Sequence, residues 1–135
     1  MSTSLEIVQA YYRYFNDKNW EGMLGLVDEN IRHEPNQAEE PRIGIDKFRD
    51  FLSHMDESYD ESLSDLTFFS EPSGKKIAVS FTVNGTYKKA EEGLPPAHGQ
   101  KYVLPAAAFL EVKNGKIVRV TTYYNLTLWL RLVAS

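Results

Sequence analysis

The stretch IAVSFTVN, residues 77–84, decides the fold, because its alternation of apolar with small or polar side chains is the clearest in the chain. Ile77, Val79, Phe81 and Val83 share one side of this alternation. A period of two residues predicts a β-strand with one buried face. We therefore expect this strand to lie in a sheet whose inner face carries these four side chains.

Three neighbouring segments have the features of further strands. Residues 63–70 are strand-like and precede a Pro-Ser-Gly turn signal. After a loop rich in Gly and Pro, residues 101–112 are apolar on both alternating sides, which predicts a strand covered on both faces. An Asn-Gly pair then favours a hairpin turn into a last strand at residues 117–124. Together with the first strand they predict an antiparallel meander.

The N-terminal part of the chain has helical periodicity instead. Thr3 and Glu6 have capping-box spacing, which predicts that a first helix begins at Thr3. Further helices are expected around residues 20–27 and 48–55, with a short strand at residues 30–34 between them. Helices segregated from a run of strands imply an α+β fold. A long, curved antiparallel sheet wrapped around three helices would enclose an apolar pocket.

Composition limits the classes of function. A chain of 135 residues is expected to form one domain, residues 1–135, and 42% hydrophobic residues are typical of a globular protein. A net charge of −4 argues against nucleic-acid binding, and no apolar run reaches the length of about 18 residues that a membrane span needs. The absence of cysteine and of signal-peptide features favours a cytoplasmic location. The three histidines lack the spacing of helical zinc sites, so we expect neither a metal nor a cofactor.

Several short motifs, taken in order, indicate a family. They are IVQAY at residues 7–11, HEP at 33–35, EPR at 40–42, the Pro-Pro loop before Gly99, and KNGKIV at 113–118. In their order and spacing, the chain resembles the cone-shaped family that includes nuclear transport factor 2, the ketosteroid isomerases and the SnoaL-like polyketide cyclases. The resemblance covers nearly the whole chain and implies the cone-shaped α+β fold. A shared fold transfers function much less safely than architecture.

The resemblance to the isomerases implies a proton-transfer site. Those enzymes remove a proton next to a carbonyl group with a carboxylate base, while a tyrosine and a protonated aspartate stabilise the oxyanion. The base aligns with Glu34 and the tyrosine with Tyr11. The residues alone favour the simpler interpretation, in which Glu34 is a solvent-facing acid at a strand end and Tyr11 is a core side chain.

The protonated aspartate of the isomerases aligns with Ala107, which has no hydrogen-bond donor. Loss of such a donor removes about 3–4 kcal/mol of transition-state stabilisation. The full isomerase mechanism is therefore not expected, unless His98, Asn36 or Tyr124 supplies another donor. His98 has a simpler interpretation as an exposed loop residue.

The alignment also gives the expected wall of the pocket, which is mostly apolar and would suit a flat hydrophobic ligand. For any single residue of this set, ordinary core packing is the alternative. The set is Val79, Phe81, Val83, Phe109, Val118, Val120, Thr122 and Tyr124.

Two functions stay open on the sequence. The first is a cofactor-independent isomerase or cyclase that abstracts a proton next to the carbonyl of a small hydrophobic substrate. The second is a non-catalytic module that binds a small ligand or a partner on the same fold.

A homodimer is also expected. If Ala107 and Phe109 face the pocket, the alternate side chains of that strand face outward, and Ile117 and Tyr123 extend the apolar patch. The outward set is Leu104, Ala106, Ala108 and Leu110. The competing explanation is that the C-terminal segment folds back and covers this patch within one chain.

Overall fold

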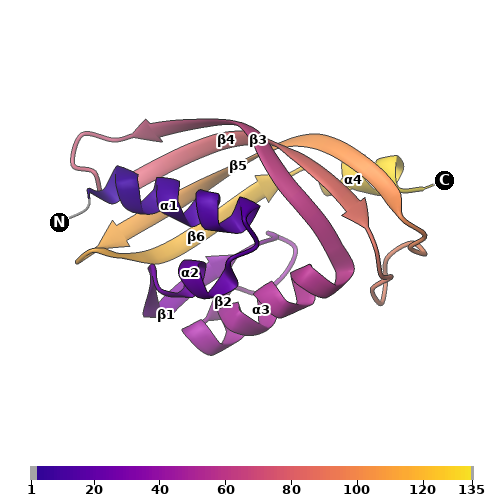
Figure 1. Ribbon diagram of the computed structural model, residues 1–135, viewed down its shortest axis with the longest axis horizontal. Helices are drawn as coiled ribbons and strands as arrows, with labels where there is room; N and C mark the ends of the chain where they lie inside the picture. Colours follow the sequence, from indigo (N-terminus) through magenta and orange to yellow (C-terminus); the bar gives the residue numbers. More distant parts are fainter. Residues whose placement is uncertain (1–2, 135) are drawn as a thin grey trace.

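The computed structural model describes residues 3–134. Helices and strands alternate early in the chain and give way to a long sheet (Figure 1). The elements are α1 (Ser4–Asn16), α2 (Trp20–Leu24), β1 (Val27–Glu34), β2 (Arg42–Ile43), α3 (Ile45–Ser58), β3 (Tyr59–Ser70), β4 (Lys76–Tyr87), β5 (Gln100–Lys113), β6 (Lys116–Tyr124) and α4 (Leu126–Leu132). This arrangement confirms the α+β fold with a curved sheet.

The six strands form one sheet in the order β2-β1-β6-β5-β4-β3. The meander from β3 to β6 is antiparallel, as the sequence predicts. Strand β1 extends the meander by pairing with β6 in parallel, whereas the sequence predicted an antiparallel sheet only. The rest of the meander lies between β1 and β6 in the sequence, yet these two strands are neighbours in the sheet.

Cross-strand register decides which face of β5 is buried. Leu104, Ala106 and Ala108 lie directly opposite Val83, Phe81 and Val79 of β4. Residues that lie opposite each other share a face of the sheet, so these β5 side chains join the inner face. The prediction that Leu104 and Ala108 face outward is therefore wrong, and both are buried.

The alternate β5 side chains consequently face outward. Val103 is 60% exposed and Phe109 55% exposed, so the outer face of β5 is not covered as its apolar sequence predicted. On β6, Tyr123 is also exposed, but Ile117 is buried because a register shift between Glu111 and Val112 turns it inward. Ile117 therefore does not extend the outer patch.

The helices lie on the inner face and close its ends. Thr3 caps α1 in the predicted capping box, with Thr3 Oγ1 accepting from the Glu6 N–H at 3.1 Å and Glu6 Oε1 from the Thr3 N–H at 2.9 Å. Figure 1 shows α1 lying across the sheet, α3 below it and α4 at the end where the chain terminates. None of the helices in residues 3–134 is long and apolar enough to cross a membrane.

Candidate functional site

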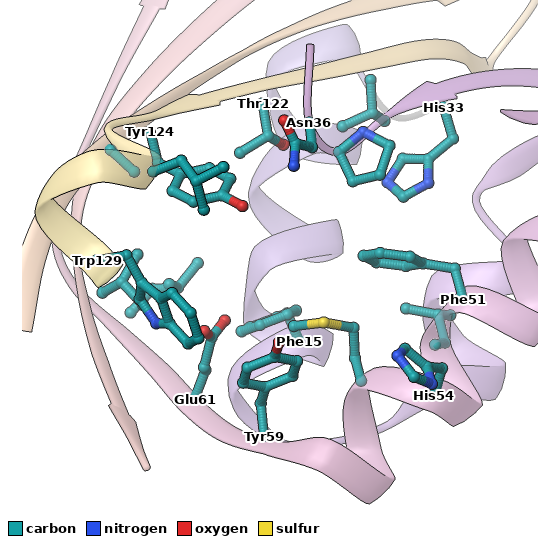
Figure 2. Close-up of a pocket in the computed structure, with 18 of the residues that line it drawn as sticks. Phe15, His33, Asn36, Phe51, His54, Tyr59, Glu61, Thr122, Tyr124 and Trp129 are labelled. Atoms are coloured by element: carbon teal, nitrogen blue, oxygen red, sulfur yellow. The ribbon is translucent and has the colours of Figure 1, made fainter. Parts of the chain in front are cut away.

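A cavity of about 390 Å³ lies between the inner face of the sheet and the helices. Its walls come from α1, α3, α4, the inner side of β3 to β6, and the loop between β4 and β5. Most of the lining is aromatic or aliphatic, with a few polar side chains, which is the usual make-up of a small-molecule site. Figure 2 shows polar groups at two places, around Glu61 and around His33.

Glu61 of β3 is one of four glutamates that line the cavity, together with Glu39, Glu91 and Glu92. Its side chain points inward beside Trp129 and Tyr59 (Figure 2). The hydroxyl of Tyr102 donates a 2.6 Å hydrogen bond to Glu61 Oε2, and Oε1 makes none with the described residues. Burial raises the pKa of Glu61, while the Tyr102 hydrogen bond and the charge of Lys18 partly offset this increase. The group is therefore suited to exchanging a proton closer to neutral pH than an ordinary carboxyl.

Gly85 makes this pair possible. It lies on β4 between Glu61 of β3 and Tyr102 of β5, directly opposite each of them. A Cβ atom at Gly85 would lie 2.2 Å from a Tyr102 ring carbon. The Tyr102 ring thus crosses β4 over the missing side chain to reach Glu61, a close approach that a glycine in a strand permits.

A second acidic group joins helix α3 to the loop between β4 and β5. Glu91 of this loop is bonded to His54 of α3, and both side chains line the cavity. Burial, and then the charge of Glu91, raise the pKa of Tyr59, which stays a neutral hydroxyl. The loop is further fixed by the Tyr87 hydroxyl, which donates to the Pro95 carbonyl at 2.6 Å.

His33 lies at a different part of the wall, on β1. It is 4% exposed, and its ring packs edge-on against Phe48 and Phe51 with centroids 4.9 and 4.5 Å apart. Burial lowers the pKa of His33 to about 3, with the charge of Arg42 adding to the effect and that of Glu34 opposing it. His33 is thus a neutral imidazole at pH 7.

Asn36 and Tyr11 supply further polar atoms to the cavity. The Oδ1 of Asn36 accepts the N–H of Ala38 at 2.9 Å, so its amide nitrogen is left to donate. The Tyr11 ring stacks on Phe48 with centroids 6.4 Å apart, and burial raises the pKa of its hydroxyl. No group of three or more His, Asp or Glu side chains within residues 3–134 could hold a metal ion.

The fold and cavity can now be compared with known proteins. The sequence model of one protein family, the SnoaL-like domain, matches residues 8–120 of this chain. The chain belongs to the SnoaL-like family. The family resemblance inferred from the sequence motifs is thereby confirmed. No curated protein matches the sequence of this SnoaL-like protein.

Solved structures agree with this assignment. A proposed polyketide cyclase from Pseudomonas putida is 42% identical, with a TM-score of 0.96 over 98% of this chain and 99% of that one. A proposed polyketide cyclase from Xanthomonas campestris is also 42% identical, with a TM-score of 0.92 over 96% of both chains. A Catenulispora acidiphila protein with a ketosteroid isomerase-like fold is 15% identical, with a TM-score of 0.77 over 98% and 95% of the chains. This third likeness shows the fold alone.

Glu34 of the SnoaL-like protein does not face the cavity, so its predicted position is wrong. Parallel pairing places it opposite Thr121, and places its neighbour His33 opposite the inward-facing Val120. Glu34 Oε1 accepts from Thr121 Oγ1 at 2.9 Å and from Arg119 Nε at 2.8 Å. Burial raises the pKa of Glu34, but the hydrogen bonds from Thr121, Arg32 and Arg119 outweigh it and lower the pKa. Glu34 is thus an ionised group on the outer face.

Four other expected pocket residues also lie outside the cavity. Val118 is half-buried at the register shift of β6 and does not line the cavity. Ala107 and Phe109 are on the outer face because the register of β5 turns their alternates inward. The cavity position next to Ala107 is Ala106, which also lacks a donor. His98 is exposed, because the loop turns Leu94 toward the cavity instead, and the His98 N–H donates to Gln100 at 2.7 Å.

The remaining expected residues are on the inner side. Val79 belongs to the buried core without lining the cavity. Those that line the cavity are Tyr11, Asn36, Phe81, Val83, Val120, Thr122 and Tyr124. Their contact with a ligand stays a prediction.

Sequence reasoning missed Glu61 and passed over His33. A signal for Glu61 was present, since Tyr59, Glu61 and Leu63 alternate on one side of the strand that leads into the predicted segment. Gly85 inside the best-defined strand was a second signal, because a strand glycine often marks a close approach. Pairing of Glu61 with Tyr102 spans 41 residues, so no local pattern indicates it.

Proposed function

We propose that this SnoaL-like protein binds a small hydrophobic carbonyl compound in the cavity and catalyses a proton transfer on it, as an isomerase or cyclase without a cofactor. The observation that carries the proposal is Glu61, a carboxyl group with a raised pKa and one free oxygen in a largely apolar cavity. Tyr102 holds the other oxygen and so orients the group. Glu61 takes the role that the isomerase resemblance had given to Glu34.

The proposed step follows from the chemistry of a carboxylate in an apolar site. Ionised Glu61 accepts the proton from a carbon next to the ligand carbonyl. The C–H electron pair becomes the new C=C bond, and the carbonyl oxygen gains the negative charge. Return of the proton to another carbon isomerises the compound, whereas attack of the enolate carbon on a second carbonyl closes a ring. The neutral hydroxyl of Tyr11 is a candidate donor to the oxyanion.

The test does not need the natural substrate. The SnoaL-like protein is incubated with 2-tetralone in D₂O, and deuterium incorporation next to the carbonyl is followed by NMR. We expect accelerated exchange that falls by about 10²–10⁴-fold in Glu61→Gln, the range of a lost general base. Glu34→Gln is the matched control, because it removes a carboxylate on the outer face and should leave exchange intact. Exchange that is equally fast in Glu61→Gln would refute the role of Glu61.

A non-catalytic binding module is the second candidate. It is favoured by the Tyr102–Glu61 hydrogen bond, since a carboxyl that is already paired can serve structure alone. In that case 2-tetralone changes the fluorescence of Trp129, which lines the cavity, but it incorporates deuterium no faster than in buffer without protein.

We also propose a homodimer through the outer face of β5 and β6. Val103, Phe109 and Tyr123 are exposed there, and the rings of Phe109 and Tyr123 pack edge-on with centroids 5.8 Å apart. Exposed apolar groups gathered in this way are typical of an interface. Helix α4 packs on β5 with Trp129 turned to the cavity, so it leaves these three side chains uncovered. The cytoplasmic location stays a prediction from composition.

A further inference from the structure

We infer that His33 and Asn36 form the binding site for the ligand's carbonyl oxygen, on the opposite side of the cavity from Glu61. This inference rests on the proposed function and names the part of the substrate that this wall recognises. The ligand class is a compound with a hydrogen-bond-accepting oxygen, such as a ketone or the enolate derived from it. Figure 2 shows His33 and Asn36 together on one side of the cavity and Glu61 across from them.

The first observation is an unpartnered nitrogen. His33 is almost fully buried, and its Nδ1 has no hydrogen-bond partner among the described residues. Within residues 3–134, Nε2 makes no hydrogen bond either, and it is less enclosed than Nδ1, since His33 lines the cavity. Buried polar groups in native proteins are nearly always satisfied, and an exception calls for an explanation. A ligand atom in the cavity would be the missing partner.

The protonation state makes the free nitrogen a donor. A neutral imidazole has one N–H and one lone pair. A proton on Nε2 faces the cavity, where a ligand can accept it, whereas a proton on Nδ1 would be buried with no acceptor. The rings of Phe48 and Phe51 clamp the imidazole edge-on and so fix the direction of this N–H. His33 is therefore a preorganised neutral donor.

Asn36 adds a second donor to the same wall. Its Oδ1 is occupied by the Ala38 N–H at 2.9 Å, which leaves the amide NH₂ to donate. No hydrogen bond of this NH₂ to another described residue is present. His33 and Asn36 lie on the same side of the cavity, so both N–H groups are available to one ligand oxygen. Donors placed in this way stabilise a developing negative charge.

The charges around this wall agree with the assignment. Arg42 of β2 lies directly opposite His33 and lines the cavity, with its guanidinium 5.4 Å from the Phe51 ring centre. Glu34, the other charged group that acts on His33, is bound to Arg119 on the outer face. Arg42 Nη2 lies 3.6 Å from Glu39 Oε2, and Glu39 also lines the cavity, so this wall carries a balanced ion pair beside the two N–H donors.

The binding test uses two naphthalenes that differ in a carbonyl group. We expect 2-acetonaphthone to bind the SnoaL-like protein more tightly than 2-ethylnaphthalene. His33→Phe should weaken binding of the ketone about three- to tenfold and change binding of the hydrocarbon little. Asn36→Asp keeps the acceptor for the Ala38 N–H and loses the NH₂ donor, so it should weaken the binding of the ketone but not of the hydrocarbon. His98→Gln is the control, because that histidine is exposed in the loop between β4 and β5 and does not line the cavity. An undiminished ketone preference in His33→Phe would overturn the inference.

A second measurement does not depend on how the His33 variant folds. In the ¹⁵N-histidine NMR spectrum, His33 is assigned by elimination with His54→Gln and His98→Gln. We expect a neutral Nε2–H imidazole from pH 8 to pH 5, and a downfield shift of its proton when 2-naphthol binds. An Nδ1–H tautomer or a titration near pH 6.5 would overturn the inference.

These results separate the inference from the proposed function. Ketone preference that depends on His33, without deuterium exchange, would leave a binding module with this oxygen site. Exchange that depends on Glu61, with a ketone preference that survives His33→Phe, would keep the proton transfer and remove the oxygen site.

Discussion

The Tyr102 hydroxyl lies 2.6 Å from Glu61 Oε2, and the Tyr102 ring reaches it by lying over Gly85. The three residues stand side by side on β5, β4 and β3. A carboxyl in an apolar cavity needs such a donor, because an unpaired buried charge is very costly. This row therefore holds the carboxyl that we propose as the general base.

Gly85→Ala should disrupt this row. The added Cβ would lie 2.2 Å from the Tyr102 ring, so the ring must move and its hydrogen bond to Glu61 must lengthen or break. We expect a loss of about 1–3 kcal/mol in the free energy of unfolding, as for other overpacked cores. Urea denaturation measures it. Gly25→Ala is the control, because there the nearest atom to the new Cβ is 3.5 Å away. Equal stability of the two variants would contradict the prediction.

Glu61 should make stability fall as pH rises. Its pKa is higher in the folded protein than the value of 4.5 expected when unfolded, so between these two values the folded state holds more protons. Stability from this group is full below pH 4.5 and is lost as the pH passes the folded-state pKa. We expect the stability of the wild type relative to Glu61→Gln to decrease over this window in urea titrations. A constant difference would show that the pKa is not raised.

His33 should have the opposite effect on the acid side. Its pKa falls from 6.5 in the unfolded chain to about 3 in the folded one, so the unfolded state binds the extra proton between these values. Stability is full above pH 6.5 and is lost toward pH 3. We expect a loss of about 2 kcal/mol between pH 6.5 and pH 5. Denaturation at both pH values measures it. The loss should persist in His54→Gln and vanish in His33→Phe.

Arginine on the outer face should separate the proposed dimer. We expect sedimentation to give twice the chain mass of 15.5 kDa for the wild type. Phe109→Arg or Tyr123→Arg should give a monomer, because each places a charge in the exposed apolar patch. Ile43→Arg is the matched control, because Ile43 is an exposed apolar residue on the edge strand β2, outside the proposed interface on β5 and β6. A wild-type monomer, or a dimer that survives both substitutions, would refute this interface.

Local patterns in the sequence were sufficient for most elements of the fold, although the two-residue strand β2 was not predicted. The capping box at Thr3 and the alternation from Ile77 to Val83 appear as predicted. Asn114 and Gly115 both have the positive φ that a type I′ turn needs. These features depend on residues close in the chain, so sequence alone reveals them. The motifs in their order also indicated the family that the domain match shows.

The site could be predicted only in part. Tyr11, Asn36 and Thr122 line the cavity as expected. The predicted base Glu34 does not line the cavity, because His33 and Glu34 are neighbours on one strand and a shift of one residue exchanges their faces. Both residues are polar, but Ile31 gave a signal, because it lies on the same side of the strand as His33 and both are buried.

The sequence by itself determined the strands, the turns and the α+β architecture, because these follow from the period of apolar residues and from the φ preferences of single residues. Tertiary structure decided which sides face the cavity. Strand β5 is apolar on both alternating sets, and only its pairing with β4 buries Leu104 and exposes Phe109. In the same way, Glu61 meets Tyr102 only when β3, β4 and β5 stand in register, since side chains far apart in the chain become neighbours through pairing alone.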